Sequence, residues 1–163
     1  MGMKANSGFF KGTKGNPVAR DANFMNSNDD LLKYIRKRKD VDLGGMFDLI
    51  AHRTANKIEL EHNGKKVFVN SRTVAKLIKI MPGYKKGQSI RLLSFNTGTL
   101  NHGFAQDLAN KLNVTVWAPN SYLWAYPNGK HFIADKKIVN EVAKPEYSKM
   151  GKFIKFTPGG NRK

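Results

Sequence analysis

The sequence predicts an α/β fold, a three-layer sandwich with a mostly parallel central sheet, a β-hairpin insertion and flanking helices. Short apolar runs at residues 46–51, 89–95 and 114–118 have the length of buried strands. Helical periodicity fills two of the intervening segments, at residues 72–81 and 104–112. Strands that alternate with helices of about ten residues are typical of βαβ units, and such units place their strands in parallel.

The first apolar run follows Gly44-Gly45 and ends at His52. After it, residues 57–61 and 66–70 alternate polar and apolar side chains on either side of Asn63-Gly64. Asn-Gly is the strongest short signal for a two-residue turn between paired strands. These segments therefore predict a β-hairpin inserted after the first strand.

Capping residues mark three helices. Asn28 or Asp29 is expected to cap a short helix over residues 30–39, which has acids at its start and bases at its end, as the helix dipole favours. Ser71 is expected to cap the helix over 72–81, and Pro82-Gly83 stops it. The helix over 104–112 is closed by Asn113.

The two ends of the chain carry weaker patterns. Residues 1–28 are rich in Gly, Asn, Ser and Lys and keep no helical or strand period, so we expect a loop-like leader that Phe9, Phe10 and Phe24 pin to the domain. Residues 29–163 are expected to form a single α/β domain. Near the other end, residues 130–134 and 152–156 are expected as edge strands that flank a polar linker around Pro145.

Charge indicates the kind of partner. Twenty-nine Lys and Arg against twelve Asp and Glu give a formal net charge of +17, which calls for an anionic partner, either nucleic acid or an acidic protein. A membrane-surface helix would need a broad apolar face, and no run reaches the roughly 18 apolar residues of a membrane span, so no membrane insertion is expected. The sequence leaves the oligomeric state open. The densest basic patch, most simply a solvated face, comprises Lys33, Arg36, Lys37, Arg38 and Lys39.

The chain contains no cysteine. A disulfide framework, a cysteine-containing zinc site and catalysis by a thiol of this chain are therefore excluded. We expect neither a cofactor nor a metal.

Polar residues follow two of the expected strands. His52 ends the first strand, and the turn from Ser94 to Gly98 ends the second. Ligands of open parallel sheets bind outside the carboxyl ends of the strands, so the two segments are expected to face each other there. Trp124 and Tyr126 follow the third strand. They are expected either to line a pocket beside His52 or to cover the core. Taken alone, His52 is also consistent with a structural residue that caps a strand.

Several segments together resemble a known family. They are Leu49-Ile50-Ala51-His52, Ile90-Arg91-Leu92-Leu93-Ser94-Phe95-Asn96-Thr97-Gly98, Gly103-Phe104-Ala105-Gln106-Asp107-Leu108-Ala109 and Val116-Trp117-Ala118-Pro119. Over roughly residues 46–135 the chain resembles the caspase-like cysteine peptidase superfamily, in the versions that close large bacterial polymorphic toxins. The resemblance implies a histidine at the end of one strand and a cysteine at the end of the next, with backbone N–H groups that hold the oxyanion.

Two departures fall at the positions that carry this chemistry. Arg53 takes the place of the glycine after the histidine, and Phe95 takes the place of the nucleophilic cysteine. A phenyl ring cannot attack a carbonyl, and Ser94 should point to the opposite face of its strand. The site is thus either degenerate or a detoxified form. The site positions implied are His52, Arg53, Ser94, Phe95 and Asn96 for catalysis, and Thr97, Gly98, Asn120, Trp124 and Tyr126 for a substrate pocket.

The resemblance implies a toxic effector domain of a bacterial competition system. Such a domain would be made in the bacterial cytoplasm as part of a larger secreted protein and delivered to the cytoplasm of a target cell. Its partner would be an acidic immunity protein that covers the His52 edge. A basic ribonuclease that uses His52, His62, His102 or His131 is the alternative, although their spacing identifies no pair. A non-enzymatic binding module is a further alternative, favoured if Phe95 and Arg53 are natural.

Overall fold

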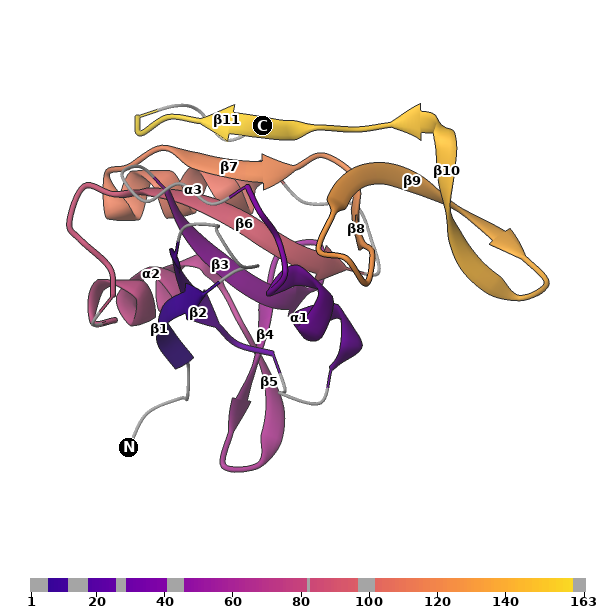
Figure 1. The fold of residues 1–163 in the computed structure, drawn as a ribbon. Helices are drawn as coiled ribbons and strands as arrows, with labels where there is room; N and C mark the ends of the chain where they lie inside the picture. Colours follow the sequence, from indigo (N-terminus) through magenta and orange to yellow (C-terminus); the bar gives the residue numbers. More distant parts are fainter. Residues whose placement is uncertain are drawn as a thin grey trace.

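The computed structural model describes residues 6–11, 18–25, 29–40, 46–81, 83–96 and 102–159. Its main sheet has the strand order β1-β2-β3-β6-β7-β11, and a hairpin of β4 and β5 extends from β3 (Figure 1). The β2–β3, β3–β6 and β6–β7 pairs are parallel, whereas the remaining pairs of this sheet are antiparallel. The strands are β1 (Asn6–Lys11), β2 (Val18–Asn23), β3 (Met46–Arg53), β4 (Ile58–His62), β5 (Lys65–Val69), β6 (Ser89–Asn96), β7 (Val116–Pro119) and β11 (Phe153–Phe156).

Successive residues of the central strands pack into two separate hydrophobic cores, one on each face of the sheet. On one face, Leu49 and Leu92 pack in a cluster with apolar residues of α2 (Ser71–Lys79) and α3 (His102–Leu112). On the other face, Ile50 and Leu93 pack in a cluster with residues of α1 (Asp30–Ile35) and of strands that follow β7. Both cores are needed because β3 and β6 are buried on both sides, as is typical of central parallel strands.

The strands after β7 form a second, antiparallel sheet with the order β10-β9-β8. It consists of β8 (Tyr122–Ala125), β9 (His131–Val139) and β10 (Val142–Met150). The far part of β9 and β10 projects from the body as a two-stranded ribbon, here called the arm (Figure 1). Asn140 and Glu141 turn the arm with φ values of 50° and 65°, the left-handed conformation of a tight hairpin turn. Apolar side chains remain exposed on it, including Ile138 and Val142.

The expected three-layer sandwich is wrong. Strands predominate over helices, the main sheet is mixed, and one of its faces is covered only by the short α1 together with the second sheet rather than by a layer of helices. The βαβ pattern held for β3, β6 and β7, which are parallel neighbours. It failed because strands before residue 25 and after residue 120 add antiparallel pairs, and the second sheet takes the place of a helical layer.

Two expected loops are also strands. Residues 6–11 and 18–23, expected within a loop-like leader, pair with each other as β1 and β2. The polar linker expected around Pro145 is β10, in which Pro145 lies opposite Lys136. Phe24 is buried, as expected of a residue that pins the start of the chain.

A buried ion network joins α1 to both central strands. The Asp48 carboxylate of β3 accepts hydrogen bonds from the guanidinium groups of Arg38 and Arg91, with N–O distances of 2.9 Å. Arg38 is fully buried, and its Nη1 also donates to the carbonyl of Ile35 at the end of α1. Arg38 therefore does not belong to an exposed basic patch, because it serves as a fixed link between α1 and the sheet.

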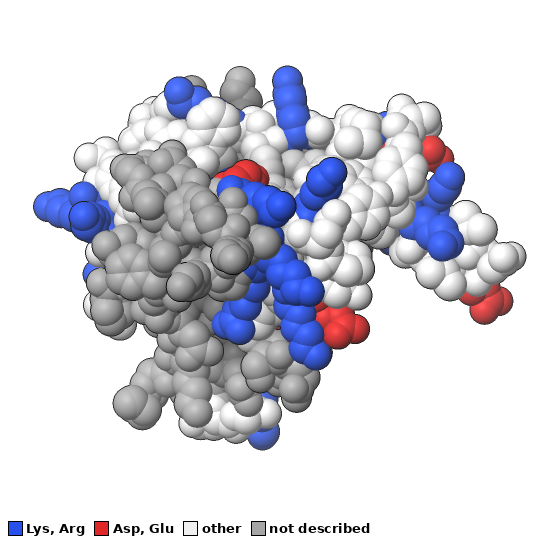
Figure 2. Space-filling view, in the orientation of Figure 1, with Lys and Arg blue, Asp and Glu red and all other residues white. Residues whose placement is uncertain are grey.

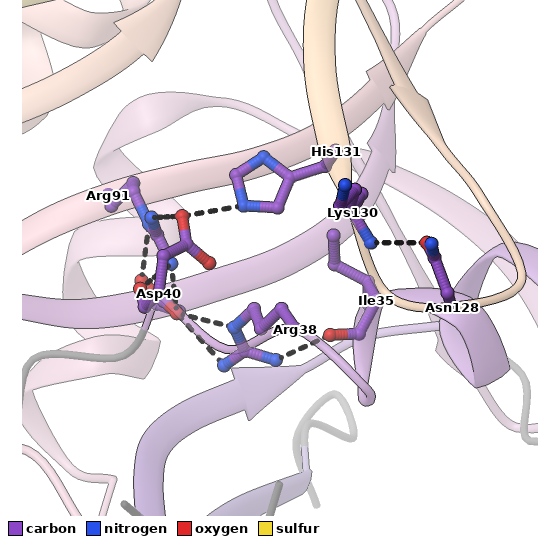
Figure 3. A network of polar contacts seen from close by, with 8 residues as sticks. Ile35, Arg38, Asp40, Arg91, Asn128, Lys130 and His131 are labelled. Atoms are coloured by element: carbon purple, nitrogen blue, oxygen red, sulfur yellow. Dashed lines mark hydrogen bonds and ion pairs between the residues drawn. The ribbon is translucent and has the colours of Figure 1, made fainter. Parts of the chain in front are cut away.

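The same network reaches the second sheet. Arg91 Nη1 donates to Asp40 Oδ2 at 2.7 Å, and His131 Nε2 lies 2.8 Å from that oxygen (Figure 3). Burial alone would raise the pKa of Asp40, but the hydrogen bond with His131 and the charge of Arg91 hold it well below its usual range. Because His131 is the first residue of β9, these hydrogen bonds fix the second sheet against β6 and α1.

Candidate functional site

The carboxyl ends of β3 and β6 border a cavity of about 620 Å³. His52 and Phe95 are register partners on these parallel strands, and both line the cavity. Their ring centroids lie 6.1 Å apart at a tilt of 56°. The structure thus brings together the two positions that the sequence placed at neighbouring strand ends, because register partners of adjacent strands point to the same face of the sheet.

Asp29 holds His52 from the side of α1. Asp29 Oδ2 lies 2.6 Å from His52 Nε2, and Asp29 Oδ1 accepts a hydrogen bond from the backbone N–H of Leu31 at 2.9 Å. One carboxylate therefore caps the helix and fixes the imidazole. Sequence reasoning identified Asp29 only as a candidate cap, since nothing in a separation of 23 residues indicates its contact with His52.

Arg53 is a buried cation beside this pair. Its residue surface is 3% exposed, and its Nε donates to Ser94 Oγ at 2.7 Å. Its two terminal nitrogens, Nη1 and Nη2, are buried and have no hydrogen-bond partner among the described residues. Burial lowers the pKa of Arg53 to about 10, although Tyr122 acts to raise it, so the guanidinium stays charged at neutral pH.

The other walls come from the hairpin and from the second sheet. Lys66 and Phe68 belong to β5, and Lys136 belongs to β9. Trp124 of β8 lines the cavity, and its Nε1 donates to the carbonyl of Ala134 at 3.0 Å, which fixes the indole. The remaining lining residues are Leu31, Thr54, Glu59, Tyr122, Leu123, Ala125 and Ala143.

Other expected site residues lie elsewhere. Ser94 is fully buried and engaged with Arg53, so it does not line the cavity. Asn120 Oδ1 accepts from the backbone N–H of Lys152, which makes Asn120 a link to the segment before β11. Tyr126 is exposed, and its hydroxyl contacts that of Tyr147 outside the cavity lining.

The expected site residues at the end of β6 and in the turn after it are described only in part. Asn96 ends β6 and pairs in register with Arg53, but its side chain lies outside the described residues. Thr97 and Gly98, expected in the substrate pocket, lie outside the described residues altogether.

Four of the five residues expected in the basic patch are exposed, and the two histidines whose side chains are described, His52 and His131, line different cavities. Lys33, Arg36, Lys37 and Lys39 are exposed, and Figure 2 shows Lys and Arg side chains gathered over the α1 region on this face. His131 lines a separate cavity of about 390 Å³ with Asp40, away from the His52 cavity. The side chains of His62 and His102 lie outside the described residues.

Taken together, the fold and the cavity define a mostly β domain with a histidine–carboxylate site at the carboxyl edge of its parallel strands. The chain belongs to the family described as Domain of unknown function (DUF8616), whose model matches residues 20–133. The match includes β3, β6 and β8, and hence His52, Arg53, Phe95 and Trp124. No curated protein and no solved structure matches the chain. Within the described ranges, the helices are too short and too polar to traverse a bilayer.

Proposed function

We propose that this chain is the effector domain of a bacterial polymorphic toxin, built on a caspase-like histidine–nucleophile site that is inactive as a peptidase in this form. The observation that carries the proposal is the pairing of His52 with Phe95 in the lining of one cavity, with ring centroids 6.1 Å apart. A cysteine side chain at position 95 would lie beside an imidazole that Asp29 holds.

The connection between the two strands supports this proposal. After His52 the chain forms the β4–β5 hairpin and α2, then returns as β6 directly beside β3. The resemblance to caspase-like peptidases implies this order of a histidine strand, a hairpin, a helix and a nucleophile strand. The Phe95 ring occupies the position where that resemblance expects a thiol.

The roles of the side chains follow from their contacts. Asp29 orients His52, and His52 would accept the proton of a thiol at position 95. Phe95 offers no proton and no nucleophile. In this chain the cavity keeps the orienting carboxylate and the base while it lacks the group that would be acylated.

An acidic immunity protein is the partner that we propose for this face. Lys66 and Lys136 line the cavity, and the chain carries a net charge of +17. A protein that covers the cavity would also contact the arm near its tip, because Ala143 of β10, which lies opposite Ile138 close to the turn, is among the lining residues. Acidic side chains over the lysines and apolar side chains over the arm would complement this surface.

Because the chain contains no cysteine, the proposed dyad can be tested with a single thiol introduced at position 95. In the Phe95→Cys variant, any thiol alkylation by iodoacetamide occurs at position 95. If the imidazole of His52 and the thiol interact, the thiolate should form at lower pH than the ordinary value of about 8.5, and alkylation near pH 7 should be faster than that of a free cysteine.

Two controls make the result specific. Adding His52→Ala should return the alkylation profile toward that of an ordinary thiol. A Phe68→Cys variant places the thiol on another wall of the same cavity, on a side chain that is 47% exposed. If the Phe95→Cys and Phe68→Cys thiols titrate alike, and His52→Ala changes neither, the proposed dyad is wrong.

Nucleic-acid cleavage is a second candidate, favoured by the charges of the same cavity. Arg53, Lys66 and Lys136 line it together with His52, and such cations would stabilise the charge that develops on a phosphate. The test is incubation of the chain with RNA over a series of salt concentrations. Cleavage that is lost in His52→Ala and weakens with salt would support a nuclease over the peptidase type.

A further inference from the structure

Arg53 combines burial, charge and missing partners. The residue is 3% exposed, yet only Nε of its guanidinium is hydrogen bonded, to Ser94 Oγ. Buried charged groups with unmade hydrogen bonds are costly, so proteins nearly always satisfy them. Nη1 and Nη2 have no such partner in the described part of the chain.

No described carboxylate neutralises this cation. Asp29 lies in the same cavity lining, but its Oδ2 is engaged with His52 and its Oδ1 with the cap of α1. Glu59 also lines the cavity without an ion pair to Arg53 within 4.0 Å. The guanidinium therefore has two unsatisfied donors in a fixed fork, the geometry that matches a phosphate or a carboxylate. Both nitrogens are buried, so a ligand in the cavity reaches them only when the side chains that cover them move.

Two further cations line the same cavity. Lys66 enters from β5 and Lys136 from β9, on walls that face the ends of β3 and β6. With Arg53 they give three positive side chains, against the already engaged Asp29 and against Glu59. The lining thus has one more cation than it has carboxylates, which favours an anionic ligand. A phosphate has enough oxygens to contact all three cations at once, whereas a carboxylate has two.

We propose that the cavity binds a phosphate group, anchored on the terminal nitrogens of Arg53 and balanced by Lys66 and Lys136. The ligand is either free phosphate or a small phosphate ester, whose organic part would lie against Trp124, which lines the same cavity. The inference does not depend on peptidase chemistry, because it requires no nucleophile at position 95. In this view Arg53 is a binding residue in its own right at the place where the resemblance expects a glycine.

Thermal unfolding of the whole chain tests the phosphate site. Sodium phosphate is titrated while sodium chloride keeps the ionic strength constant, so that general screening does not contribute. The parent chain should show a saturable rise in Tm, roughly 5–10 °C at a concentration about 100 times Kd. A parallel titration with adenosine 5′-monophosphate distinguishes the sources, because tighter binding than that of phosphate indicates an ester and equal binding indicates the phosphate group alone.

Matched variants assign the response to Arg53. Arg53→Met should remove the rise and, because it eliminates an unsatisfied buried charge, should fold at least as stably as the parent without phosphate. Arg72→Met removes the same charge from an exposed position on α2 and should keep the full rise. The Lys66→Ala, Lys136→Ala double variant leaves Arg53 in place and should weaken binding by about tenfold or more. It also serves as the test if Arg53→Met does not fold.

Two outcomes would overturn the proposal. One is a parent chain whose Tm does not respond saturably to either ligand at constant ionic strength. The other is a response that persists unchanged in Arg53→Met, or in the double lysine variant if Arg53→Met does not fold. Either result would show that the unsatisfied guanidinium is not a binding site for phosphate.

Discussion

Asp48→Asn is the substitution that should affect the fold most through a single group. Asp48 accepts one hydrogen bond from Arg38 and two from Arg91, each at 2.9 Å, and its Oδ2 also forms an ion pair with Arg38 Nη2 at 2.9 Å. Its residue surface is 4% exposed. An amide of the same shape removes the negative charge between two buried guanidinium groups. Breaking a buried ion pair by changing one partner costs about 3–5 kcal/mol. For a chain of this length that cost corresponds to a fall in Tm of roughly 6–20 °C.

Urea unfolding followed by circular dichroism measures this loss, with Asp30→Asn as the matched control. Asp30 pairs with Lys33 at 3.8 Å, but both side chains are largely exposed, so the control should cost less than about 1 kcal/mol. The reasoning fails if Asp48→Asn also costs less than about 1 kcal/mol. That result would mean that the buried network contributes little to holding α1 and β6 against β3.

Two further predictions concern acid stability and a helix end. Because the pKa of Asp40 is lower in the folded chain than its unfolded value near 4, Asp40 stabilises the fold above that pH. This contribution should be lost as the pH falls below about 4, and urea midpoints of Asp40→Asn should depend less on pH there than those of the parent. Asn113 ends α3 with a φ of 56°, so Asn113→Ala should cost about 1 kcal/mol and Asn113→Gly almost nothing. Equal urea midpoints for these two variants would contradict the second prediction.

Turn chemistry shows how far the sequence could predict the fold. Asn63 and Gly64, with φ values of 52° and 77°, form the turn that their sequence predicts, and the β4–β5 hairpin is confirmed. Asn140 and Glu141 adopt the same left-handed conformation without a glycine, so the β9–β10 hairpin carried no comparable signal. Its tip also lies outside any core, which leaves its strands without the alternation that burial imposes.

The candidate site was predictable where it depends on strand ends. His52 and Phe95 follow apolar runs on neighbouring parallel strands, so their proximity follows from the topology. Asp29 could not be found in this way, because its contact with His52 depends on how α1 packs. Arg38 looked like part of a solvated basic run, since its partner Asp48 lies within an apolar strand and becomes visible only in three dimensions.

Burial of Arg53 is the feature that sequence reasoning missed most completely. The residue stood out only as a departure from an expected glycine, with no indication that Ser94 would hold its Nε inside the protein. The contact arises at the strand ends, where Arg53 of β3 pairs in register with Asn96 of β6. Its consequence is a charged cavity wall beside His52.

Growth of bacteria that express the Phe95→Cys chain tests the central claim most directly. If the cavity is a histidine–nucleophile site that a thiol at position 95 restores with Arg53 still in place, expression of this variant should arrest growth, while the parent chain and the Phe95→Cys, His52→Ala double variant should be tolerated at equal protein levels. Growth arrest by the parent chain itself, unchanged by substitution of Phe95, would contradict the claim and place the toxic chemistry outside this dyad.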